Sequence, residues 1–381
     1  MNKTTTGLVY LDYCATTPVD PDVAEIVMRH MVSEFGNAGS RTHELGAQAK
    51  RAVENARRQV SEALGVQPNE VVFTSGATES NNLAILGLAE HGIRSGRTHI
   101  VTTAIEHKSV LEPCAQLESR GFTVTYIRPN KSGSIDPVEV LAATNNKTLL
   151  VSVQHANNET GVINPIETII HGAHKAGSLV HIDAAQSFCK VPGVVSLNDA
   201  DLLSISGHKI GAPKGIGALR INHRREVHRL IKPILFGGGQ EFGVRPGTVA
   251  VPLVAGFGMA AQIGSNEIVR RYEACLKTKY AIMNFIKNLG FSIIGSGPSL
   301  PNCISVCFYP IDAEAIFVAL KSSHCVSNGS ACTSASRSRS HVLGAMGLYE
   351  DLIDCSIRLS WQESTRLEDI ESAIDLISKL R

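Results

Sequence analysis

Short apolar runs alternate with amphipathic helical patterns between residues 71 and 205. The strand-like runs are Val71–Thr74, His99–Thr103, Phe122–Ile127, Leu149–Val153, Leu179–Ile182 and Asp201–Ile205. Helical spacing of apolar residues separates them, as in 78–90 and 109–120. Strands that alternate with helices are joined by right-handed crossovers. We therefore predict an α/β fold with a mostly parallel central sheet.

The residue patterns before and after this region predict further helices and a second, smaller α+β unit. Asp20 and Pro21 favour a helix start, as N-cap and first residue, and Gly65 favours the end of a second helix. A long helical pattern runs from about Pro252 to Lys287. The last 90 residues or so predict strands at 291–294, 303–308 and 355–360, helices at 313–321 and 365–380, and a capping box that begins at Thr365. The expected domains are 20–258 and, together, 1–19 plus 259–381.

Composition and charge match an ordinary globular protein. Hydrophobic residues make up 43% of the chain, charged residues 19%, and the net charge is +1, so nothing indicates direct nucleic-acid binding. The polar start lacks a signal peptide, and no apolar run is long enough for a membrane helix. Nine scattered cysteines without a CxxC pair favour a reducing compartment. We expect a cytoplasmic protein without metal.

Lys209 is the first candidate for chemistry. It follows a buried-looking strand through Ser206, Gly207 and His208, and the glycine-rich stretch 211–215 comes after it. Most lysines are solvated surface charges. A lysine held near the backbone and desolvated instead suits Schiff-base chemistry. We predict that Lys209 carries pyridoxal phosphate (PLP).

Other strand ends supply what this cofactor needs. Residues 73–78 form a strand, a tight turn and a helix start, whose free N–H groups favour a phosphate. Asp183, at a strand end, would hold the ring nitrogen, Gln186 the ring hydroxyl, and His107 would cover the ring. Each has a structural alternative: helix capping by Ser75, Thr78 or Asp183, a surface glutamine, a structural histidine.

Several longer motifs together resemble the cysteine desulfurases, PLP enzymes of fold type I in the class-V aminotransferase family. The motifs are residues 74–82 (TSGATESNN), 106–108 (EHK), 157–161 (NNETG), 181–186 (HIDAAQ) and 206–209 (SGHK). The similarity runs from about Tyr10 to the last helix. It implies PLP-dependent removal of sulfur from L-cysteine, with L-alanine as product.

Residues 328–336 (NGSACTSAS) resemble the family's long loop with its persulfide-forming cysteine, here Cys332. The sequence itself places Cys332 among small and hydroxyl residues with Arg337 and Arg339 nearby, which favours a reactive thiolate. The expected span of this loop is about 325–341. The resemblance implies that Cys332 takes the sulfur and delivers it to a protein acceptor.

The resemblance also implies roles for the remaining site residues. Lys209 binds the cofactor and moves protons at the substrate carbon, and His107 stacks on the ring. Arg358 binds the substrate carboxylate, its alternative being a surface charge on a strand. Thr248 reaches the phosphate of a neighbouring subunit, which implies a homodimer with shared active sites. The other positions are Ala77, Thr78, Asn158, Asp183, Gln186, Ser206 and His208 for the cofactor, with Asn37 and Asn158 for the substrate.

The sequence departs from the family pattern at three turns. Gly211 and Ala212 replace a Tyr-Gly pair, Ala38 and Gly39 follow Asn37, and residues 361–363 (WQE) replace a Gly-Arg turn. The chain also stops at Arg381, without the tail of the desulfurases of iron–sulfur cluster assembly. DNA phosphorothioation or another thio-modification therefore stands beside cluster assembly as the expected pathway.

Two other functions fit these residues less well than a cysteine desulfurase does. A selenocysteine lyase, or another PLP carbon–sulfur lyase, needs no acceptor thiol, so the presence of Cys332 disfavours it. A non-catalytic scaffold would not need to retain Lys209, His107, Asp183 and Arg358 together with Cys332.

Overall fold

A seven-stranded sheet forms the centre of the computed structural model, which describes residues 7–329 and 339–381. Its strands are β2 (Val71–Thr74), β3 (His99–Thr103), β4 (Thr123–Ile127), β5 (Thr148–Gln154), β6 (Leu179–Asp183), β7 (Leu202–Ser206) and β8 (Gly217–Ile221). They lie in the order β2-β8-β7-β6-β5-β3-β4, and only the pairs made by β8 are antiparallel. The predicted mostly parallel sheet is confirmed. β8 was not predicted.

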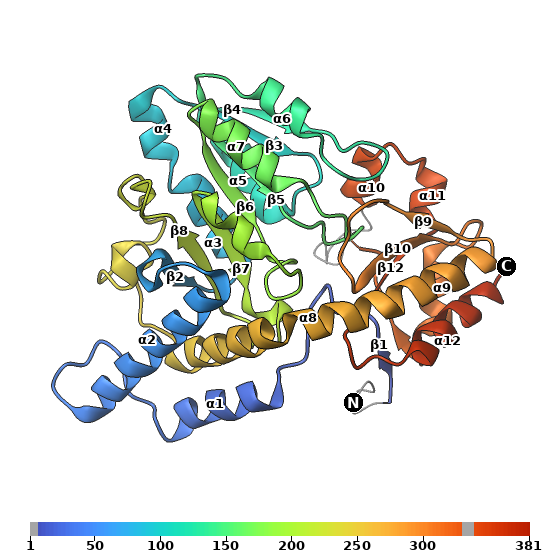
Figure 1. Ribbon diagram of the computed structural model, residues 1–381, viewed down its shortest axis with the longest axis horizontal. Helices are drawn as coiled ribbons and strands as arrows, with labels where there is room; N and C mark the ends of the chain where they lie inside the picture. The colour runs from blue at the N-terminus through green and yellow to red at the C-terminus, as the bar shows by residue number, and fades with distance from the viewer. Residues whose placement is uncertain (1–6, 330–338) are drawn as a thin grey trace.

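Helices cover both faces of this sheet (Figure 1). They are α1 (Pro21–Val32), α2 (Glu44–Leu64), α3 (Ala77–Leu86), α4 (Ala89–Ser95), α5 (Lys108–Glu118), α6 (Pro137–Ala143) and α7 (Ile166–Lys175). Side chains of α2, α6, α7 and the long α8 (Val251–Asn288) share one buried apolar cluster, and those of α3, α4 and α5 share another. Successive strand residues alternate between the two clusters, because neighbouring side chains in a strand point to opposite faces.

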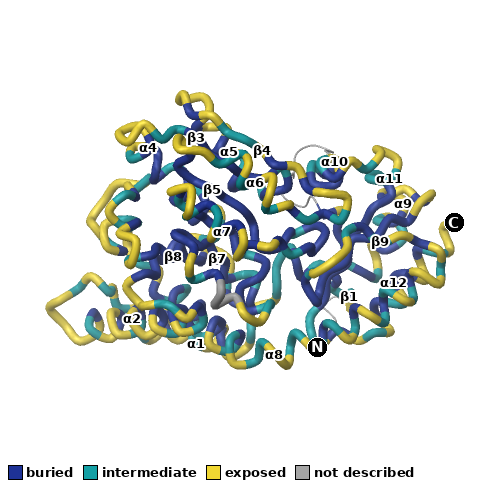
Figure 2. The backbone as a smooth tube through the Cα atoms, turned by 45° about the horizontal axis from the view of Figure 1, so that its top comes forward, coloured by how far each residue is buried: buried dark blue, intermediate teal, exposed yellow. Residues whose placement is uncertain are grey.

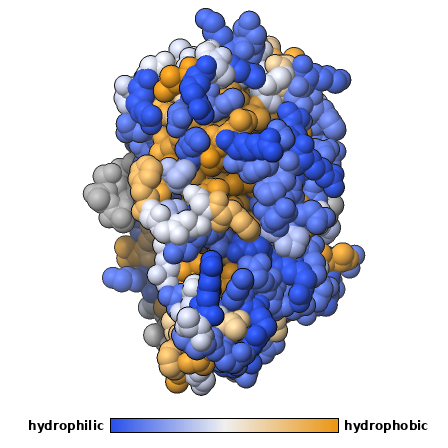
Figure 3. All heavy atoms as spheres, turned by 90° about the vertical axis from the view of Figure 1, so that its left-hand side faces the viewer, coloured by the Kyte–Doolittle hydropathy of each residue, from blue (hydrophilic) through white to orange (hydrophobic). Residues whose placement is uncertain are grey.

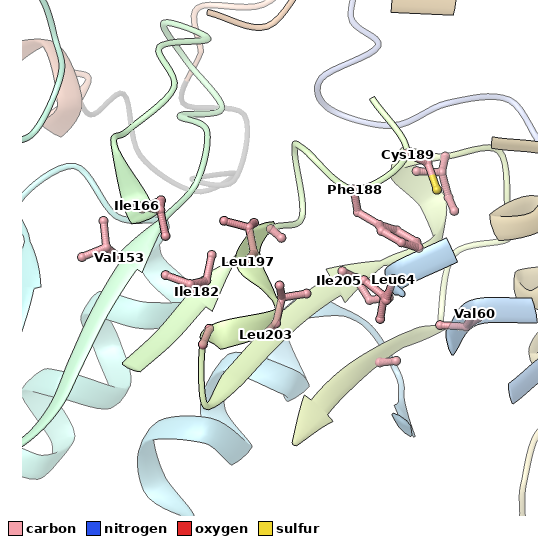
Figure 4. Packing of buried hydrophobic residues seen from close by; sticks show 14 of the residues in the cluster. Val60, Leu64, Val153, Ile166, Ile182, Phe188, Cys189, Leu197, Leu203 and Ile205 are labelled. Atoms are coloured by element: carbon pink, nitrogen blue, oxygen red, sulfur yellow. The ribbon is translucent and has the colours of Figure 1, made fainter. Parts of the chain in front are cut away.

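The packing of one face is visible from close by. Figure 4 shows Ile205 of the sheet next to Leu64 of α2 and Phe188, with Ile182 and Leu203 farther along the same cluster. The central strands are buried along their length, whereas the outer helices expose part of their surface (Figure 2). Such burial on both faces explains why these strands read as continuous apolar runs.

Two expected helix boundaries were wrong. The helix expected over 78–90 is divided into α3 and α4 at Gly87, whose carbonyl accepts a hydrogen bond from the Lys232 amide at 2.9 Å. The chain around Lys232 packs so closely against Gly87 that a Cβ on Gly87 would lie 2.9 Å from the Lys232 carbonyl oxygen. The capping box at Thr365 does not form: α12 has Arg366 as N-cap, and the Thr365 hydroxyl accepts from the Gln362 amide instead.

A smaller antiparallel sheet lies at the other end of the molecule. Its strands are β9 (Ser292–Ile294), β10 (Cys303–Cys307) and β12 (Ser356–Ser360), in the order β12-β10-β9. The short strands β1 (Val9–Tyr10) and β11 (His324–Cys325) pair in parallel, and the remaining helices are α9 (Ala313–Leu320), α10 (His341–Ala345), α11 (Glu350–Asp354) and α12 (Leu367–Ser378). Helix α8 packs on α1 and α2 near its start and on α12 and β9 near its end, so it joins the two sheets (Figure 1).

Candidate active site

Several of the predicted cofactor residues lie at one edge of the large sheet. Strands β2, β3, β6 and β7 all point the same way, and the chain leaves their carboxyl ends at Thr74, Thr103, Asp183 and Ser206. Loops at this edge of a parallel sheet are where α/β proteins bind ligands. The sheet thus brings together side chains that are more than 100 residues apart in sequence.

A chain of hydrogen bonds connects Asp183 with His107. Asn81, one turn into α3, donates from Nδ2 to Asp183 Oδ2 and to Ser109 Oγ, at 2.8 Å each. The Ser109 hydroxyl is 2.8 Å from His107 Nδ1, and the Ala185 amide donates to Asp183 Oδ1 at 2.9 Å. The carboxylate and the imidazole are therefore oriented by the same two residues. Sequence reasoning gave neither Asn81 nor Ser109 a role.

Lys209 lies at the end of the 3-10 turn Gly207–Lys209, directly after β7. Its Nζ donates to the carbonyl oxygens of Cys14 and Ala15, at 2.6 and 2.8 Å. Gln186 Nε2 donates to the same Cys14 oxygen at 2.9 Å. A Cβ on Gly207 would lie 2.8 Å from Ile216 Cγ2, so glycine lets the turn pack closely. Lys209 Nζ is thus held beside two backbone carbonyl oxygens, and the residue as a whole is half-buried.

The start of α3 offers uncapped N–H groups. Its N-cap is Gly76, at φ 150°, and no side chain caps the helix, so capping by Ser75 or Thr78 does not occur. A Cβ on Gly76 would meet nothing within 4 Å, and the amides of Ala77 and Thr78 begin the helix next to this open space. Exposed amides at a helix start favour an anion such as a phosphate.

Two further predicted cofactor residues border Lys209. Ser206 is buried at the end of β7, and His208 Nδ1 lies 3.1 Å from the Thr16 hydroxyl. Burial is the larger cause and the positive charge of Lys209 the next, and together they lower the pKa of His208 to about 4. His208 is therefore a neutral imidazole at physiological pH, able to donate one hydrogen bond without adding charge.

Arg358, on β12, faces this edge from the small sheet. Its side chain is only 2% exposed, which excludes the alternative of a surface charge. It donates to Asp12 Oδ1 at 2.5 Å and to the Asn158 carbonyl at 2.7 Å, while Nε has no partner among the described residues. Burial opposes its charge, but the neighbouring Cys14 and Asp12 outweigh that effect and raise the pKa of Arg358. A guanidinium that is held in place and still has an N–H donor without a partner can bind the carboxylate of a substrate.

Glu159 accepts a hydrogen bond at one described end of the segment that carries the predicted cysteine, and it lies close to the other end. Ser340 donates to Glu159 Oε2 at 2.5 Å, and a Cβ on Gly329 would lie 2.9 Å from the same oxygen. Arg358 also donates to the Gly329 carbonyl at 3.5 Å. Cys332 itself lies outside the described residues, so its predicted place in the site is not tested.

Two predicted site residues, Asn37 and Thr248, are exposed. Asn37 is exposed in the loop between α1 and α2, where its Oδ1 accepts from the Gly39 amide at 2.8 Å. Thr248 is exposed in the segment before α8.

The donors and acceptors at this edge fit PLP. There is a lysine for its aldehyde carbon, a carboxylate for its ring nitrogen and an uncapped helix start for its phosphate. Next to them, Glu106 is fully buried, and burial raises the pKa of Glu106 to about 8. A protonated Glu106 adds no negative charge beside Asp183. The sequence gave no signal for this, because burial of a glutamate at a strand end depends on its neighbours.

Known proteins are similar to this chain along nearly its whole length. The family model described as aminotransferase class-V matches residues 9–372. The chain is 44% identical over 375 residues to the cysteine desulfurase IscS of Klebsiella pneumoniae, covering 97% of this chain and 92% of the relative. Among solved structures, DndA from Streptomyces lividans is 44% identical (TM-score 0.80; 93% and 99% of the two chains covered). SspA in complex with cysteine is 37% identical (TM-score 0.81; 94% and 99% covered).

Proposed function

Because the chain belongs to the aminotransferase class-V family and, within it, to the cysteine desulfurases, we propose that it moves sulfur from L-cysteine onto Cys332 as a persulfide. The observation that carries the proposal is the geometry at the sheet edge. Lys209, Asp183 and His107 converge there, and Arg358 faces them from the small sheet. This combination supports a cofactor site next to a site for the substrate carboxylate.

PLP, when bound, supplies an electron sink for the substrate carbon next to its ring. Lys209 would hold its aldehyde carbon, Asp183 its ring nitrogen, Gln186 its ring hydroxyl, and His107 its face. The Ala77 and Thr78 amides, Ser206 and His208 would bind its phosphate, and Asn158 would help to place it. Asn81 and Ser109 would keep Asp183 and His107 oriented, because they already bridge the two side chains.

Different residues of the chain would bind the cysteine substrate, move a proton and accept its sulfur. Arg358 would fix the substrate carboxylate, with Asn37 and Asn158 as further polar contacts, and Lys209 would move a proton at the substrate α carbon. The Cys332 thiolate would attack the substrate sulfur: a sulfur–sulfur bond forms, the carbon–sulfur bond breaks, and the carbon keeps the electron pair and takes up a proton. The products are alanine and an enzyme persulfide, so no external oxidant is needed.

A pair of variants tests this assignment. Lys209→Ala should lose the cofactor's bound absorbance and all activity, whereas Cys332→Ser should keep the absorbance and lose cysteine-dependent sulfide release. A wild-type protein that stays colourless after incubation with PLP would contradict the cofactor site. Normal turnover by Cys332→Ser would show that the nucleophile is wrong, and turnover of selenocysteine by that variant would indicate a lyase.

We also propose a homodimer that shares its active sites. Several large apolar side chains are exposed, namely Phe236 (91%), Phe35 (66%), Val32 (65%), Met28 (60%) and Phe242 (59%). Figure 3 shows apolar surface gathered on the side of the molecule that carries α2 and β2. Thr248 follows Phe236 and Phe242 in the chain and is also exposed. Covering this surface with a second copy would remove apolar area from water and bring Thr248 to the partner's phosphate site.

Light scattering tests the dimer. The wild type should have the mass of two chains, and Phe236→Asp should shift it towards one chain with weaker PLP binding. Val318→Asp is the matched control, because Val318 is 76% exposed and lies on α9, at the opposite end of the molecule from α2 and β2 (Figure 1). A monomeric wild type would contradict the shared site.

The sulfur acceptor is proposed to be a protein. Similarity to IscS on the one hand and to DndA and SspA on the other supports the two predicted pathways, iron–sulfur cluster assembly and DNA phosphorothioation or another thio-modification. Transfer of radiolabelled sulfur from cysteine to purified candidate acceptors would separate them.

Two smaller proposals concern the domain boundaries and the compartment. We place the domain boundaries at 20–258 and at 1–19 plus 259–381, since each group contains one of the two main sheets. Each of the eight cysteines in the described residues is a free thiol, which supports a reducing compartment such as the cytoplasm. Within residues 7–329 and 339–381, no helix has the length and apolar character to cross a membrane.

A further inference from the structure

The carboxylate of Glu79 lies at the helix start that is proposed to bind the cofactor phosphate. Glu79 is the third residue of α3, directly after Ala77 and Thr78, and its side chain is 11% exposed. Its Oε2 accepts a hydrogen bond from the Ser75 amide at 2.6 Å, so the side chain turns back towards the residues before Gly76. A phosphate at the Ala77 and Thr78 amides would therefore have a carboxylate as its neighbour.

The Glu79 carboxylate is ionised in the folded protein. Burial opposes its charge, but hydrogen bonds from Arg245 and Ser75 outweigh burial and lower the pKa of Glu79. The phosphate of PLP is a monoester that carries more than one negative charge near neutral pH, and like charges at close range repel each other. Without compensation, Glu79 would therefore oppose the ligand that the helix start is proposed to bind.

Arg245 supplies that compensation. Its Nε donates to Glu79 Oε1 at 2.8 Å and its Nη2 to Glu79 Oε2 at 3.3 Å, so the planar guanidinium contacts both carboxylate oxygens. Among the described residues, no other cation lies within 4 Å of the Glu79 carboxylate, and no other carboxylate lies within 4 Å of the Arg245 guanidinium. The charge of each side chain is thus balanced by the other.

A second ion pair fixes the segment from which Arg245 extends. Glu241 accepts from both terminal nitrogens of Arg57, at 2.7 and 2.8 Å, and from the Phe73 amide of β2 at 2.8 Å. The side chains of Arg57 and Glu241 are each 4% exposed. Glu241 and Phe242 adopt left-handed backbone conformations, with φ 48° and 58°, which non-glycine residues rarely do. The segment is therefore tied to the strand before the phosphate turn, and Arg245 to the helix after it.

We propose that Arg245 is a positioning residue for the cofactor: it neutralises Glu79 and thereby lets the start of α3 bind the phosphate of PLP. The inference rests on the proposed PLP site, but it does not depend on the sulfur chemistry of Cys332. Arg245 acts through Glu79, which holds the Ser75 amide and so fixes the turn that leads into the helix.

Pyridoxal tests this role, because it has the ring and the aldehyde of PLP but no phosphate. The full-length protein, freed of cofactor, is titrated with each aldehyde, and the absorbance of the bound form gives the two dissociation constants. Arg245→Met should weaken PLP binding roughly tenfold, since an unbalanced carboxylate then faces the phosphate, and should change pyridoxal binding by less than about twofold. Arg245→Lys keeps the charge and should retain most of the affinity for PLP.

Removing the carboxylate as well separates neutralisation from direct contact with the phosphate. In the double variant Arg245→Met with Glu79→Gln, PLP affinity should return to within about threefold of the wild type, because no charge is left to repel the phosphate. Glutamine also keeps an acceptor oxygen for the Ser75 amide. Glu79→Gln alone should bind PLP at least as tightly as the wild type, since the charge of Arg245 is then unbalanced. Arg366→Met is the control: it breaks an ion pair with Asp369 at the start of α12 and should change neither constant.

Three outcomes would overturn the proposal while leaving the PLP site intact. If the double variant binds PLP as weakly as Arg245→Met, then Arg245 touches the phosphate itself or holds Thr248 in place, and does not act by balancing Glu79. If Arg245→Met weakens pyridoxal as much as PLP, the ion pair supports the fold and not the phosphate site. If Glu79→Gln loses affinity for PLP but not for pyridoxal, the carboxylate helps to bind the phosphate. A wild type that binds neither aldehyde would instead overturn the PLP site, and this inference with it.

Discussion

The two halves of the site are built in different ways. On the cofactor side, Asp183, Asn81, Ser109 and His107 form one continuous hydrogen-bonded chain at the edge of the large sheet. On the sulfur side, the described contacts are anchors at the two ends of a segment, where Gly329 and Ser340 meet Glu159. On the cofactor side, hydrogen bonds orient the side chains proposed to react. On the sulfur side, the described contacts lie only at the two ends of the segment that contains Cys332.

This difference corresponds to two chemical tasks. A cofactor must be held in one orientation while protons move, which favours groups positioned by strand ends. A sulfur carrier must collect sulfur at the cofactor and release it elsewhere. Arg358 joins the two halves, since it contacts both the Asn158 carbonyl and the Gly329 carbonyl. Changes in the cofactor half should therefore affect chemistry most, and changes at the anchors should affect sulfur transfer alone.

The largest effect should come from Asp183→Ala. Removing the carboxylate at the ring nitrogen takes away a preorganised charge, so kcat for alanine formation should fall roughly 10²–10³-fold. Cofactor absorbance should remain, because Lys209 is unchanged. Asp201→Asn is the matched control: it is a buried acid on the neighbouring part of the sheet that binds His174 instead. A decrease of less than tenfold in Asp183→Ala would contradict its role.

Arg358→Lys should have the next largest effect, on KM. Lysine keeps the charge but loses the planar fork, so KM for cysteine should rise about 10–100-fold, while kcat changes less. Steady-state kinetics measure this, and thermal melting of the same variant checks the contact with Asp12. A lower melting temperature with unchanged KM would show that Arg358 is structural.

Glu159→Ala should produce a smaller change that is restricted to the sulfur half. Losing the hydrogen bond from Ser340 costs about 1 kcal/mol, so sulfide release should slow about fivefold. Glu159→Gln keeps an acceptor oxygen and should stay close to the wild type. Both variants should keep the cofactor spectrum, and a spectral change in either would mean that the two halves are not separable.

Glu106→Gln should change stability rather than activity. Burial raises the pKa of Glu106 to about 8 in the folded state, so the native protein binds more protons than the unfolded chain between about pH 4.5 and 8. Stability of the wild type must then decrease as pH rises through this window, by up to about 1.4 kcal/mol per unit from this group. Denaturation at several pH values should show a flatter profile for Glu106→Gln. Parallel profiles would contradict the shift.

Strands were easier to predict than contacts between helices. Val71–Thr74 and His99–Thr103 were predicted with their observed bounds, because buried parallel strands are short apolar runs. β8 was missed because it begins with Gly217 and Ala218, which carry little strand signal. Its place between β2 and β7 depends on long-range pairing that no local pattern encodes.

The same distinction holds for the site. Asp183 and Lys209 follow strands, so their position at the sheet edge could be inferred from the sequence. Asn81 and Ser109 belong to helices α3 and α5, and only the packing of those helices brings them together. Arg358 could be assigned only by resemblance, because its partner Asp12 lies 346 residues away.

The most direct measurement of the central claim is mass spectrometry of the sulfur carrier. The holoenzyme is given cysteine without a reductant, alkylated, digested and analysed peptide by peptide. One extra sulfur atom on the peptide that contains Cys332, absent in Lys209→Ala, is the predicted result. An extra sulfur on another cysteine, or alanine formed with no persulfide at Cys332, would contradict the proposed function.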